Sequence, residues 1–344
     1  MADRTNRRIL LARRPQGEIE DACFRRDEVP APSPGSGEAL VRTLYLSLDP
    51  TIRGWMNEAD TYLPAIGLGD VIRSGGVGEV VVSQSSRYRV GELVFGMLGW
   101  QEYALADEGL RAMQVLPPGI EPTDALSVYG ITGVTAYFGM LDVGRPQPGE
   151  TVLVSGAAGA TGSVAGQIAK LSGCRVVGTA GTPEKCRWVV DELGFDACID
   201  YRREDVPKRL RETCPAGVDV FFDNVGGAIL EAALDRLNDR ARVVLCGGIS
   251  AYNALEPPPG PRNLMQLVIH RARMEGFIVL DYLHRFPEAM GKLGAWVGEG
   301  RLRYAVDVQD GLERAPQALR RLFTGENTGK LMVRVAERET SQPA

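Results

Sequence analysis

A turn rich in glycine and alanine follows a buried strand in the middle of the chain and could bind phosphate. Residues 151–162 read TVLVSGAAGATG, and a helix is expected over Ser163–Leu171 directly after the turn. Gly159 and Gly162 keep the Gly-x-x-Gly half of the dinucleotide fingerprint, in which backbone N–H groups at a helix N-terminus contact a pyrophosphate. Ala157 stands at the position of the first glycine. The turn is therefore typical both of a dinucleotide site and of an ordinary strand-to-helix connection.

Apolar runs alternate with helical patterns from this turn onward and predict the sheet that would position it. The predicted strands are Thr151–Ser155, Arg175–Ala180, Ala197–Asp200, Val218–Asp223, Arg242–Cys246 and Gly276–Leu280, and the helical patterns start near Thr161, Pro183, Arg203, Gly226 and Pro261. Parallel strands joined by helical crossovers form a doubly wound Rossmann sheet, which binds ligands at the carboxyl ends of its strands. That edge would gather Ser155, Thr179, Asp223, Asn224 and the loop from Gly247 to Ser250. In this setting the turn is interpreted as a dinucleotide site.

The residues beyond the second predicted strand favour NADP over NAD as the dinucleotide. An Asp or Glu at the end of this strand would hydrogen-bond the ribose hydroxyls of NAD, but residues 178–182 read GTAGT. Lys185 lies one turn into the next helix, and Arg202 and Arg203 follow the third strand. Cations suit the 2′-phosphate of NADP. The alternative for Lys185 is an ordinary solvated helix lysine.

The length and composition of the chain limit what else it could be. Its 344 residues suggest two domains, and a formal net charge of −5 argues against a nucleic-acid partner. Residues 151–169 carry no charge, but their Gly, Ser, Thr and Gln content fits a strand and a helix better than a membrane span. No signal peptide is apparent, and the six cysteines, which form no C-x-x-C pair, indicate a cytoplasmic protein with reduced thiols. The two histidines, His270 and His284, lie at no metal-ligand spacing, so no metal is expected.

The first 120 residues have a different sequence pattern from the middle of the chain. In them, short strand-like runs are separated by turns rich in proline and glycine. The runs are Arg8–Ala12, Ala39–Leu48, Gly78–Val82, Glu92–Met97 and Glu102–Ala106. From Tyr304 onward the sequence returns to short strands, of which Lys330–Ala336 is the clearest. We expect residues 1–124 plus 305–344 to form a β-rich, barrel-like domain and residues 125–304 to form the Rossmann domain, which makes the chain an α/β protein.

Five strings of the sequence carry a family resemblance that spans nearly the whole chain. They are AGATGSVAGQIAKL (158–171), FDNVGG (222–227), CGGISAYN (246–253), RMEGF (273–277) and GENTGK (325–330). Together they resemble the medium-chain dehydrogenase/reductase superfamily. The resemblance is to its zinc-free branch of prostaglandin reductases, leukotriene hydroxydehydrogenases and related alkenal or curcumin-type reductases. Where the zinc-dependent branch carries metal ligands, this chain reads SLDP (47–50) and IGLGD (66–70).

The resemblance implies a Rossmann domain that binds NADP, a GroES-like catalytic domain, and a set of site residues. The implied cofactor-binding residues are Gly159, Ala160, Thr161 and Gly162 at the pyrophosphate, Lys185 at the 2′-phosphate, Tyr201 at the adenosine end, Asn224, Cys246, Gly247, Gly248, Ile249, Ser250 and Tyr252 along the ribose and nicotinamide, Phe277, Ile278 and Val279 along the nicotinamide, and Asn327 from the C-terminal segment. Arg53 matches an arginine at the substrate mouth, whereas Thr51 stands where many members carry a tyrosine. The choice of substrate is therefore open.

The reaction implied by the resemblance is hydride transfer from NADPH to the β carbon of an α,β-unsaturated ketone or aldehyde, without a metal, in a homodimer. The charge that develops on the enolate oxygen needs a hydrogen-bond donor, and a phenol stays protonated at neutral pH. Tyr252 is the candidate donor, alone or with a cofactor ribose hydroxyl, and packing against the cofactor is its alternative role. Two other functions remain as alternatives: a quinone oxidoreductase of the same superfamily, and a protein that binds NADPH without catalysis.

Overall fold

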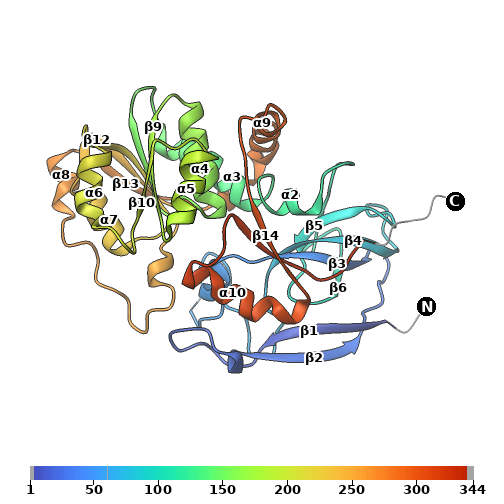
Figure 1. Cartoon of the computed structure of the whole chain (residues 1–344). Helices are drawn as coiled ribbons and strands as arrows, with labels where there is room; N and C mark the ends of the chain where they lie inside the picture. The colour runs from blue at the N-terminus through green and yellow to red at the C-terminus, as the bar shows by residue number, and fades with distance from the viewer. Residues whose placement is uncertain (1–3, 60, 339–344) are drawn as a thin grey trace. The chain divides into compact units, whose positions relative to one another are not determined.

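The structure is a computed structural model that describes residues 4–59 and 61–338 (Figure 1). The chain divides into two compact units. The first is formed by Met1–Leu126, Val306–Glu326 and Leu331–Ala344, and the second by Ser127–Ala305 and Asn327–Lys330. The short segment Asn327–Lys330 thus belongs to the second unit, although the sequence on both sides of it belongs to the first. The functional domain limits at 124/125 and 304/305 stay a prediction.

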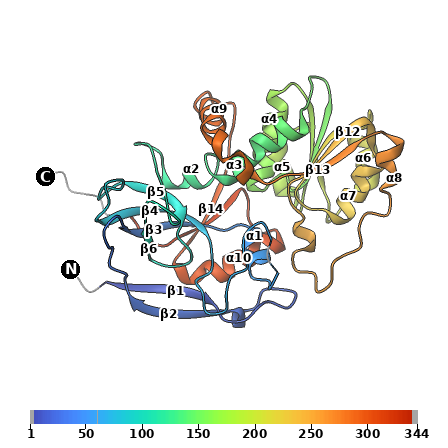
Figure 2. The same cartoon turned by 180° about the vertical axis from the view of Figure 1, so that it is seen from behind.

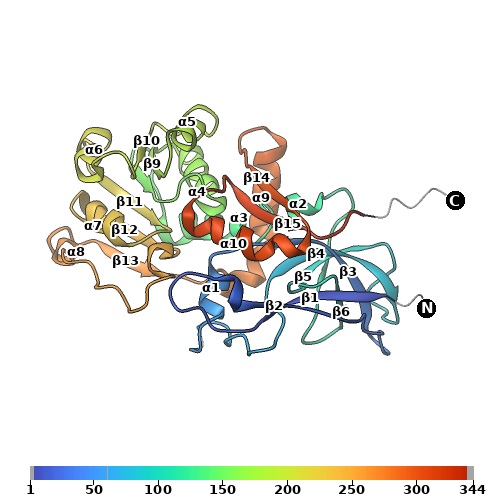
Figure 3. The same ribbon diagram turned by 60° about the horizontal axis from the view of Figure 1, so that its bottom comes forward.

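The second unit is built on a six-stranded parallel sheet in the order β10-β9-β8-β11-β12-β13 (Figure 3). The strands are β8 (Thr151–Val154), β9 (Arg175–Ala180), β10 (Ala197–Asp200), β11 (Val218–Asp223), β12 (Leu237–Leu245) and β13 (Arg273–Gly276). Every neighbouring pair is parallel. This order, in which the first strand lies beside the second and the fourth, is that of the Rossmann fold. The predicted doubly wound sheet is therefore confirmed.

Helices cover both faces of this sheet because successive side chains of each strand point to opposite sides. Val152 and Val154 pack in a buried cluster with residues of α3, α4 and α9, whereas Leu153 packs in a second cluster with residues of α6 and α7. The helical elements of the unit are α3 (Ile131–Phe138), the π-helix η2 (Gly139–Gly144), α4 (Ala160–Leu171), α5 (Pro183–Asp191), α6 (Val206–Thr213), α7 (Gly227–Leu234), η3 (Ile249–Ala251), α8 (Met265–Ile269), η4 (Val279–Arg285) and α9 (Phe286–Gly298).

The predicted last strand, Gly276–Leu280, is wrong apart from its first residue. The strand is Arg273–Gly276, which pairs in parallel with the end of β12, and the 3-10 helix η4 begins at Val279. β13 is one of the two outermost strands of the sheet and is largely exposed, so it does not need the apolar run by which buried strands are recognised. The predicted helix starts at Arg203 and Pro261 are also early. Asp205 caps α6 by accepting the Lys208 N–H at 2.8 Å, and α8 begins only at Met265.

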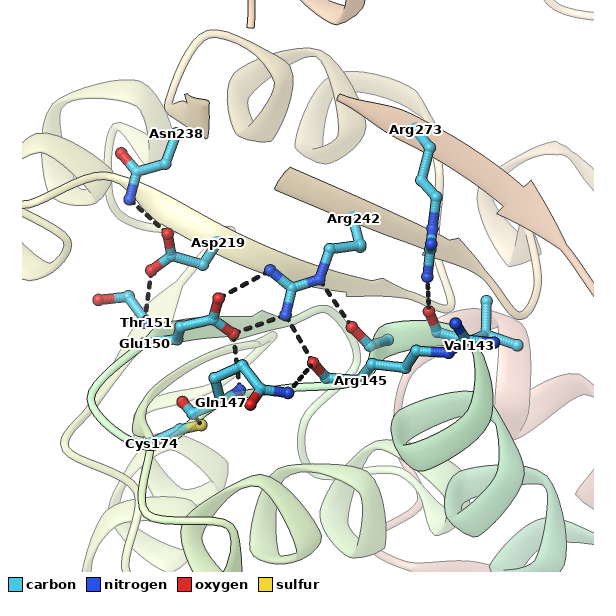
Figure 4. A network of polar contacts seen from close by, with 11 residues as sticks. Val143, Arg145, Gln147, Glu150, Thr151, Cys174, Asp219, Asn238, Arg242 and Arg273 are labelled. Carbon is cyan, nitrogen blue, oxygen red and sulfur yellow. Dashed lines mark hydrogen bonds and ion pairs between the residues drawn. The ribbon is translucent and has the colours of Figure 1, made fainter. Parts of the chain in front are cut away.

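A network of polar contacts ties β12 to the segment that leads into β8 (Figure 4). The Arg242 guanidinium donates to both carboxylate oxygens of Glu150, at 2.8 and 2.6 Å, and to the carbonyl oxygens of Gly144 and Arg145. Burial is the largest single effect on the pKa of Glu150 and raises it, but the hydrogen bonds from Arg242 and from the Gln147 N–H, together with the charge of Arg242, lower the pKa overall. The network lies at the amino ends of the strands, so it fixes the sheet from the side opposite the predicted ligand edge.

The first unit is β-rich, as predicted, and its strands pair antiparallel (Figure 2). A seven-stranded sheet runs in the order β14-β15-β3-β4-β5-β7, with β6 on β3, and β1 pairs with β2. Its elements are β1 (Thr5–Leu11), η1 (Asp21–Cys23), β2 (Phe24–Pro30), β3 (Ala39–Ser47), α1 (Thr51–Trp55), β4 (Gly75–Ser83), β5 (Leu93–Met97), β6 (Tyr103–Ala106), β7 (Gln114–Val115), α2 (Pro122–Leu126), β14 (Val306–Asp310), η5 (Leu312–Arg314), α10 (Ala315–Thr324) and β15 (Lys330–Arg334).

The C-terminal tail was predicted as short strands, and the prediction misses one long helix. α10 occupies Ala315–Thr324 between β14 and β15, and it buries Ala318 and Leu319 against the core of the first unit while Arg320 and Arg321 carry its polar side. The apolar residues recur with the helical period, which a search for short strands overlooks.

Candidate dinucleotide-binding site

The glycine-rich turn begins one residue earlier than the sequence motif suggested. Gly156 has a φ of +62°, in the left-handed region that favours glycine. A Cβ at Gly162 would lie 2.3 Å from the Gly156 carbonyl oxygen, so helix α4 can approach the turn only because residue 162 has no side chain. Ala157 is therefore not a replaced glycine. The glycines that shape the turn are Gly156, Gly159 and Gly162, three residues apart.

The close approach of helix α4 to the turn predicts that a methyl group at residue 162 destabilises the protein. Gly162→Ala is expected to lower the free energy of unfolding by about 1–3 kcal/mol, because the new Cβ must push the backbone of the turn away. Chemical denaturation followed by circular dichroism measures the change. Gly291→Ala is the matched control, since Gly291 lies inside α9 and a Cβ there meets no atom within 4 Å. If the two variants were equally stable, the turn would not be held at the distance described here.

The first turn of α4 has the features of an anion site. The N-cap residue is Gly159, which has no side chain that could accept a hydrogen bond from the first N–H groups of the helix. The helix carries no charged residue before Lys170, and its dipole places partial positive charge at this end. A pyrophosphate satisfies both the N–H groups and the dipole. The predicted residues Ala160 and Thr161 lie in this turn of the helix.

A segment from near the end of the chain lies against the glycine-rich turn. Gly329 donates its N–H to the Ala158 carbonyl oxygen at 2.8 Å and forms an isolated parallel bridge with Gly159. A Cβ at Gly329, whose φ is +66°, would lie 2.1 Å from the Ala305 carbonyl oxygen. Asn327 is buried, and its side-chain amide donates to the Gly329 carbonyl oxygen at 3.1 Å. The structure thus brings Asn327 next to the turn.

Ser155 and Asp223 join the carboxyl ends of β8 and β11. The Ser155 hydroxyl donates to the Asp223 carboxylate at 2.7 Å and accepts the Asn224 N–H at 2.8 Å. The carboxylate also accepts the N–H groups of Val225 and Gly226 at 3.0 Å. Burial raises the pKa of Asp223, although these donors act against it. The Asn224 side chain donates to the Ser155 carbonyl oxygen at 2.7 Å, so the predicted cofactor residue Asn224 is fixed at this edge.

Neither Ser155 nor Asp223 was among the predicted site residues, although both were placed at the carboxyl edge of the sheet. The signal that could have singled them out is their polarity, since each ends a run of buried apolar residues. A buried polar residue at a strand end requires a partner, and here the two residues satisfy each other.

The loop after β12 is anchored on the same strand end. The N–H groups of Cys246 and Gly247 donate to the Asp223 carbonyl oxygen at 2.9 and 3.1 Å. Ser250 donates to the Val225 carbonyl oxygen through both its N–H, at 3.1 Å, and its hydroxyl, at 2.6 Å. The predicted loop residues Cys246–Ser250 therefore lie beside Asn224, held by backbone hydrogen bonds.

Tyr252 turns its hydroxyl back to this loop. The phenol oxygen accepts the Gly248 N–H at 3.3 Å, so the proton of the hydroxyl is not used in that bond. Burial raises the pKa of Tyr252, against a smaller opposite effect of the Gly248 N–H. A phenol with a raised pKa is protonated at neutral pH. Tyr252 therefore has the protonation state required of a hydrogen-bond donor.

The side chain of Phe277 is turned into the core, and the backbone from Phe277 to Val279 continues from β13. A Cβ on Gly139 would lie 2.5 Å from the edge of the Phe277 ring, so the ring packs directly on the backbone of η2. The ring also contacts Tyr282 edge-on, with 6.4 Å between centroids. At Phe277 the backbone groups are therefore left for the predicted strip along the nicotinamide, and the part of Ile278 and Val279 in it stays a prediction.

The predicted adenosine end lies at the carboxyl ends of β9 and β10. Lys185 is in the first turn of α5, where the Thr182 hydroxyl caps the helix by accepting the Lys185 N–H at 3.3 Å. Tyr201 follows β10, and a Cβ at Gly181 would lie 2.8 Å from the Tyr201 hydroxyl oxygen. The Arg202 guanidinium lies over the Tyr201 ring at 5.9 Å from its centroid. The structure thus places Lys185 and Tyr201 on adjacent elements, with a second cation beside them.

One buried hydroxyl at this edge lacks a hydrogen-bond partner in the protein, and a bound ligand could supply one. The Oγ1 atom of Thr179 is buried and has no hydrogen-bond partner among the described residues. The Thr179 carbonyl oxygen accepts the Ala157 N–H at 2.9 Å, so this residue borders the glycine-rich turn. A buried polar atom without a partner is costly, and a bound dinucleotide is one way to satisfy it.

Arg53 lies in the first unit, and its guanidinium forms hydrogen bonds within the protein. The residue is 2% exposed. Its guanidinium donates to the side chain of Asn57 and to the carbonyl oxygens of Gly17, at 2.9 Å, and Pro15, at 3.5 Å. Burial lowers its pKa from the usual arginine value. These contacts give Arg53 a role in fixing the loop at residues 15–17, and its predicted contact with substrate stays a prediction. Thr51 in turn shares a hydrogen bond with the Tyr62 hydroxyl.

Residues 4–59 and 61–338 contain no group of three or more His, Cys, Asp or Glu side chains that could hold a metal ion. Within the same residues, no helix has the length and apolar character needed to cross a membrane.

Comparisons with known proteins agree with this architecture. A family profile described as "N-terminal domain of oxidoreductase" matches residues 7–115, and one described as "Zinc-binding dehydrogenase" matches residues 160–295. The chain is 44% identical over 336 residues to an NADPH-dependent curcumin reductase of Escherichia coli, which covers 96% of this chain and 97% of that protein. It is 39% identical over 324 residues to rat prostaglandin reductase 1, which covers 93% and 96%.

A solved structure is similar over the same length. The crystal structure of CurA from Vibrio vulnificus in complex with NADPH superposes with a TM-score of 0.92 and 42% sequence identity, covering 96% of this chain and all of that one. The Rossmann sheet and the β-rich GroES-like unit are thus those of a known architecture. The chain belongs to the zinc-free, NADP-dependent branch of the medium-chain dehydrogenase/reductase superfamily.

Proposed function

We propose that this protein uses NADPH to reduce the carbon–carbon double bond of α,β-unsaturated ketones and aldehydes. The observation that carries the proposal is the Tyr252 phenol, held by the Gly248 N–H on a loop that is anchored to the strand end beside Asn224. The similarity over nearly the full length to reductases named for curcumin and prostaglandin supports the same reaction class.

The residues that would hold NADPH all belong to the second unit. The pyrophosphate would bind the first turn of α4, from Gly159 to Gly162, and Lys185 would pair with the 2′-phosphate beside Tyr201. Asn224, the loop Cys246–Ser250, the backbone of Phe277–Val279, and Asn327 would line the ribose and nicotinamide. Arginine and lysine at the 2′ position select NADPH over NADH.

NADPH, when bound, supplies a hydride to the β carbon of the enone. Negative charge then develops on the carbonyl oxygen of the substrate. The Tyr252 hydroxyl would donate a hydrogen bond to that oxygen, and its acceptance of the Gly248 N–H strengthens it as a donor because hydrogen bonds in a chain polarise one another. The α carbon then takes a proton from solvent or from the hydroxyl.

The position of isotope label in the product tests this reaction. With NADPH labelled by deuterium at C4, we expect one deuterium on the β carbon of the saturated ketone, and in heavy water one solvent deuterium on the α carbon. Nuclear magnetic resonance of the product locates both. Label on the carbonyl carbon, giving an allylic alcohol, would mean that the protein is an alcohol dehydrogenase.

Two alternative functions have different outcomes in the same assay. A quinone oxidoreductase would oxidise NADPH with quinones and yield no saturated ketone. A protein that only binds NADPH would do so tightly and turn over no enone. A screen of NADPH oxidation with alkenals, long-chain enones, prostaglandin-type enones and quinones separates the three and also ranks the substrates.

The proposed reaction requires no metal, which gives a prediction for chelation. Activity is expected to survive prolonged dialysis against a strong chelator, and elemental analysis is expected to find no stoichiometric zinc. Loss of turnover on chelation and its recovery with zinc would contradict a metal-free reaction.

We also propose that the protein is a homodimer and works in the cytoplasm. The outer strand β13 and the exposed apolar side chains of Met265, Val268 and Ile269 on α8 support a surface for a second copy. All six cysteines are free, which suits a reducing compartment. Analytical ultracentrifugation measures the mass in solution, and a monomer at micromolar concentration would contradict the dimer.

A further inference from the structure

The π-helix η2 packs against the segment that follows β13. Its widened turn is visible in the bond from the Arg145 N–H to the Met140 carbonyl oxygen, at 2.8 Å, because these residues are five positions apart. π-Helices are rare and occur often at functional sites. None of the predicted site residues lies in η2, but the segment after β13 contains the predicted nicotinamide strip Phe277–Val279. The contacts between the two elements therefore bear on the position of the strip.

Gly139 is the first residue of η2, and the Phe277 ring lies directly on its backbone. A Cβ at Gly139 would lie 2.5 and 2.9 Å from two atoms of the Phe277 ring, Cζ and Cε1, and 2.8 Å from Cε2 of Phe222. Carbon atoms that are not bonded to each other pack at about 3.5–4.0 Å. The Phe277 ring can therefore occupy this place only because residue 139 has no side chain.

Two further contacts join this part of the chain to η4, which begins two residues after Phe277. The Phe138 ring stacks on the Tyr282 ring, with 4.5 Å between centroids and 18° between the ring planes. Asp142, inside η2, forms an ion pair with Arg285, and the Arg285 guanidinium also lies over the Phe138 ring at 4.8 Å from its centroid. Together with the Phe277 ring, these contacts fix the segment from the end of β13 to the end of η4.

We propose that Gly139 is a positioning residue for the nicotinamide of NADPH and acts through Phe277. The inference rests on the proposed function, in which the backbone from Phe277 to Val279 runs along the nicotinamide. The Phe277 ring is turned into the core, so the distance at which it packs on Gly139 sets the position of the backbone that carries it. A methyl group at residue 139 displaces this backbone. The pyrophosphate turn and Lys185 stay in place, because they lie on α4 and α5.

Two ligands that differ only in the nicotinamide test the proposal. NADPH carries this ring, and 2′-phospho-ADP-ribose is the same molecule without it. Gly139→Ala is expected to raise the Kd for NADPH about three- to tenfold and to leave the Kd for 2′-phospho-ADP-ribose within about twofold of the wild-type value, as measured by isothermal titration calorimetry. The rate of hydride transfer at saturating NADPH is expected to fall about tenfold to a hundredfold, because a displacement of about 1 Å of a reacting group has effects of this size.

Gly144→Ala is the matched control variant, because Gly144 is the last residue of the same π-helix and is also buried. A Cβ there would lie 3.2 Å from the side chain of Val220, and none of its three nearest atoms belongs to Phe277. This variant is expected to lose stability and to keep the wild-type Kd for both ligands. Equal weakening of NADPH in the two variants, or equal weakening of both ligands by Gly139→Ala, would overturn the proposal.

Phe277→Leu keeps the proposal testable if Gly139→Ala does not fold. Leucine lacks the ring atoms that lie on Gly139, so this variant is also expected to weaken NADPH and to leave 2′-phospho-ADP-ribose unchanged.

The double variant Gly139→Ala/Phe277→Leu tests whether Gly139 acts through Phe277. Alanine there fills part of the space that the ring vacates, so the rise in the Kd for NADPH is expected to be smaller than the product of the two single effects. Single effects that multiply would overturn an action through Phe277. If the wild type bound neither ligand, the proposed function would fail. If it bound both and Gly139→Ala and Phe277→Leu did likewise with unchanged Kd values, only the role of Gly139 would fail.

Discussion

Tyr252→Phe is expected to reduce enones about 10²- to 10³-fold more slowly than the wild type, which is the usual cost of removing one donor from a developing oxyanion. The substitution keeps the ring and removes only the hydroxyl, so the packing of residue 252 against the loop should persist. The hydroxyl accepts one backbone N–H, that of Gly248, at 3.3 Å, and such a long bond contributes little to the position of the loop. We therefore expect the Kd for NADPH to stay within about twofold of the wild-type value.

Stopped-flow measurement of the hydride-transfer rate, together with a separate NADPH titration, distinguishes the two roles of Tyr252. Tyr282→Phe is the matched control, because Tyr282 lies in the same unit and its ring stacks on Phe138 with 4.5 Å between centroids. That variant should keep the wild-type rate. An unchanged rate in Tyr252→Phe would make Tyr252 a packing residue and leave the donor role to a ribose hydroxyl or to water.

Lys185→Ala is expected to raise the Kd for NADPH while leaving that for NADH nearly unchanged. The lost contact is a charge-assisted hydrogen bond to the 2′-phosphate, worth about 1.5–3 kcal/mol, which corresponds to roughly tenfold to over a hundredfold in affinity. NADH lacks this phosphate, so the same substitution removes no contact from it. The ratio of the two dissociation constants, measured by fluorescence titration, is the decisive quantity.

Lys208 provides a close control for this experiment. It is the third residue of α6, as Lys185 is of α5, and both backbone N–H groups are capped by the residue before the helix. Lys208→Ala should therefore reproduce any effect on helix stability and none on cofactor choice. Equal weakening of NADPH and NADH in Lys185→Ala would remove the argument for a 2′-phosphate contact.

The strands that the sequence predicted best are those buried on both faces. β8, β9 and β11 are apolar runs bounded by turns, and a parallel sheet covered by helices requires this pattern. β13 failed because its residues, Arg273–Gly276, are largely exposed, while the apolar residues after them form a helical turn. β2 was missed for the same reason, since the charged run Phe24–Pro30 is largely exposed and pairs only with β1.

Parts of the candidate site depend on contacts that no local pattern records. The motif placed the first glycine at Ala157, whereas the left-handed residue is Gly156, because backbone conformation and not spacing decides which glycine is required. The pairing of Ser155 with Asp223 joins residues 68 positions apart. Sequence periodicity predicts elements, but such pairs depend on how the elements pack.

The hydrogen bond from Gly329 to Ala158 has a consequence for synthesis of the chain on the ribosome. Every strand of the parallel sheet has been synthesised once residue 276 has been added, so the sheet can form when that residue leaves the ribosome, while translation continues. The glycine-rich turn lacks its neighbour until Asn327–Lys330 follow, after β14 and α10 of the other unit. A nascent chain stalled between these points would display an unfinished nucleotide pocket. Capture on an NADP-linked resin should therefore begin only with nascent chains in which residue 330 has left the ribosome.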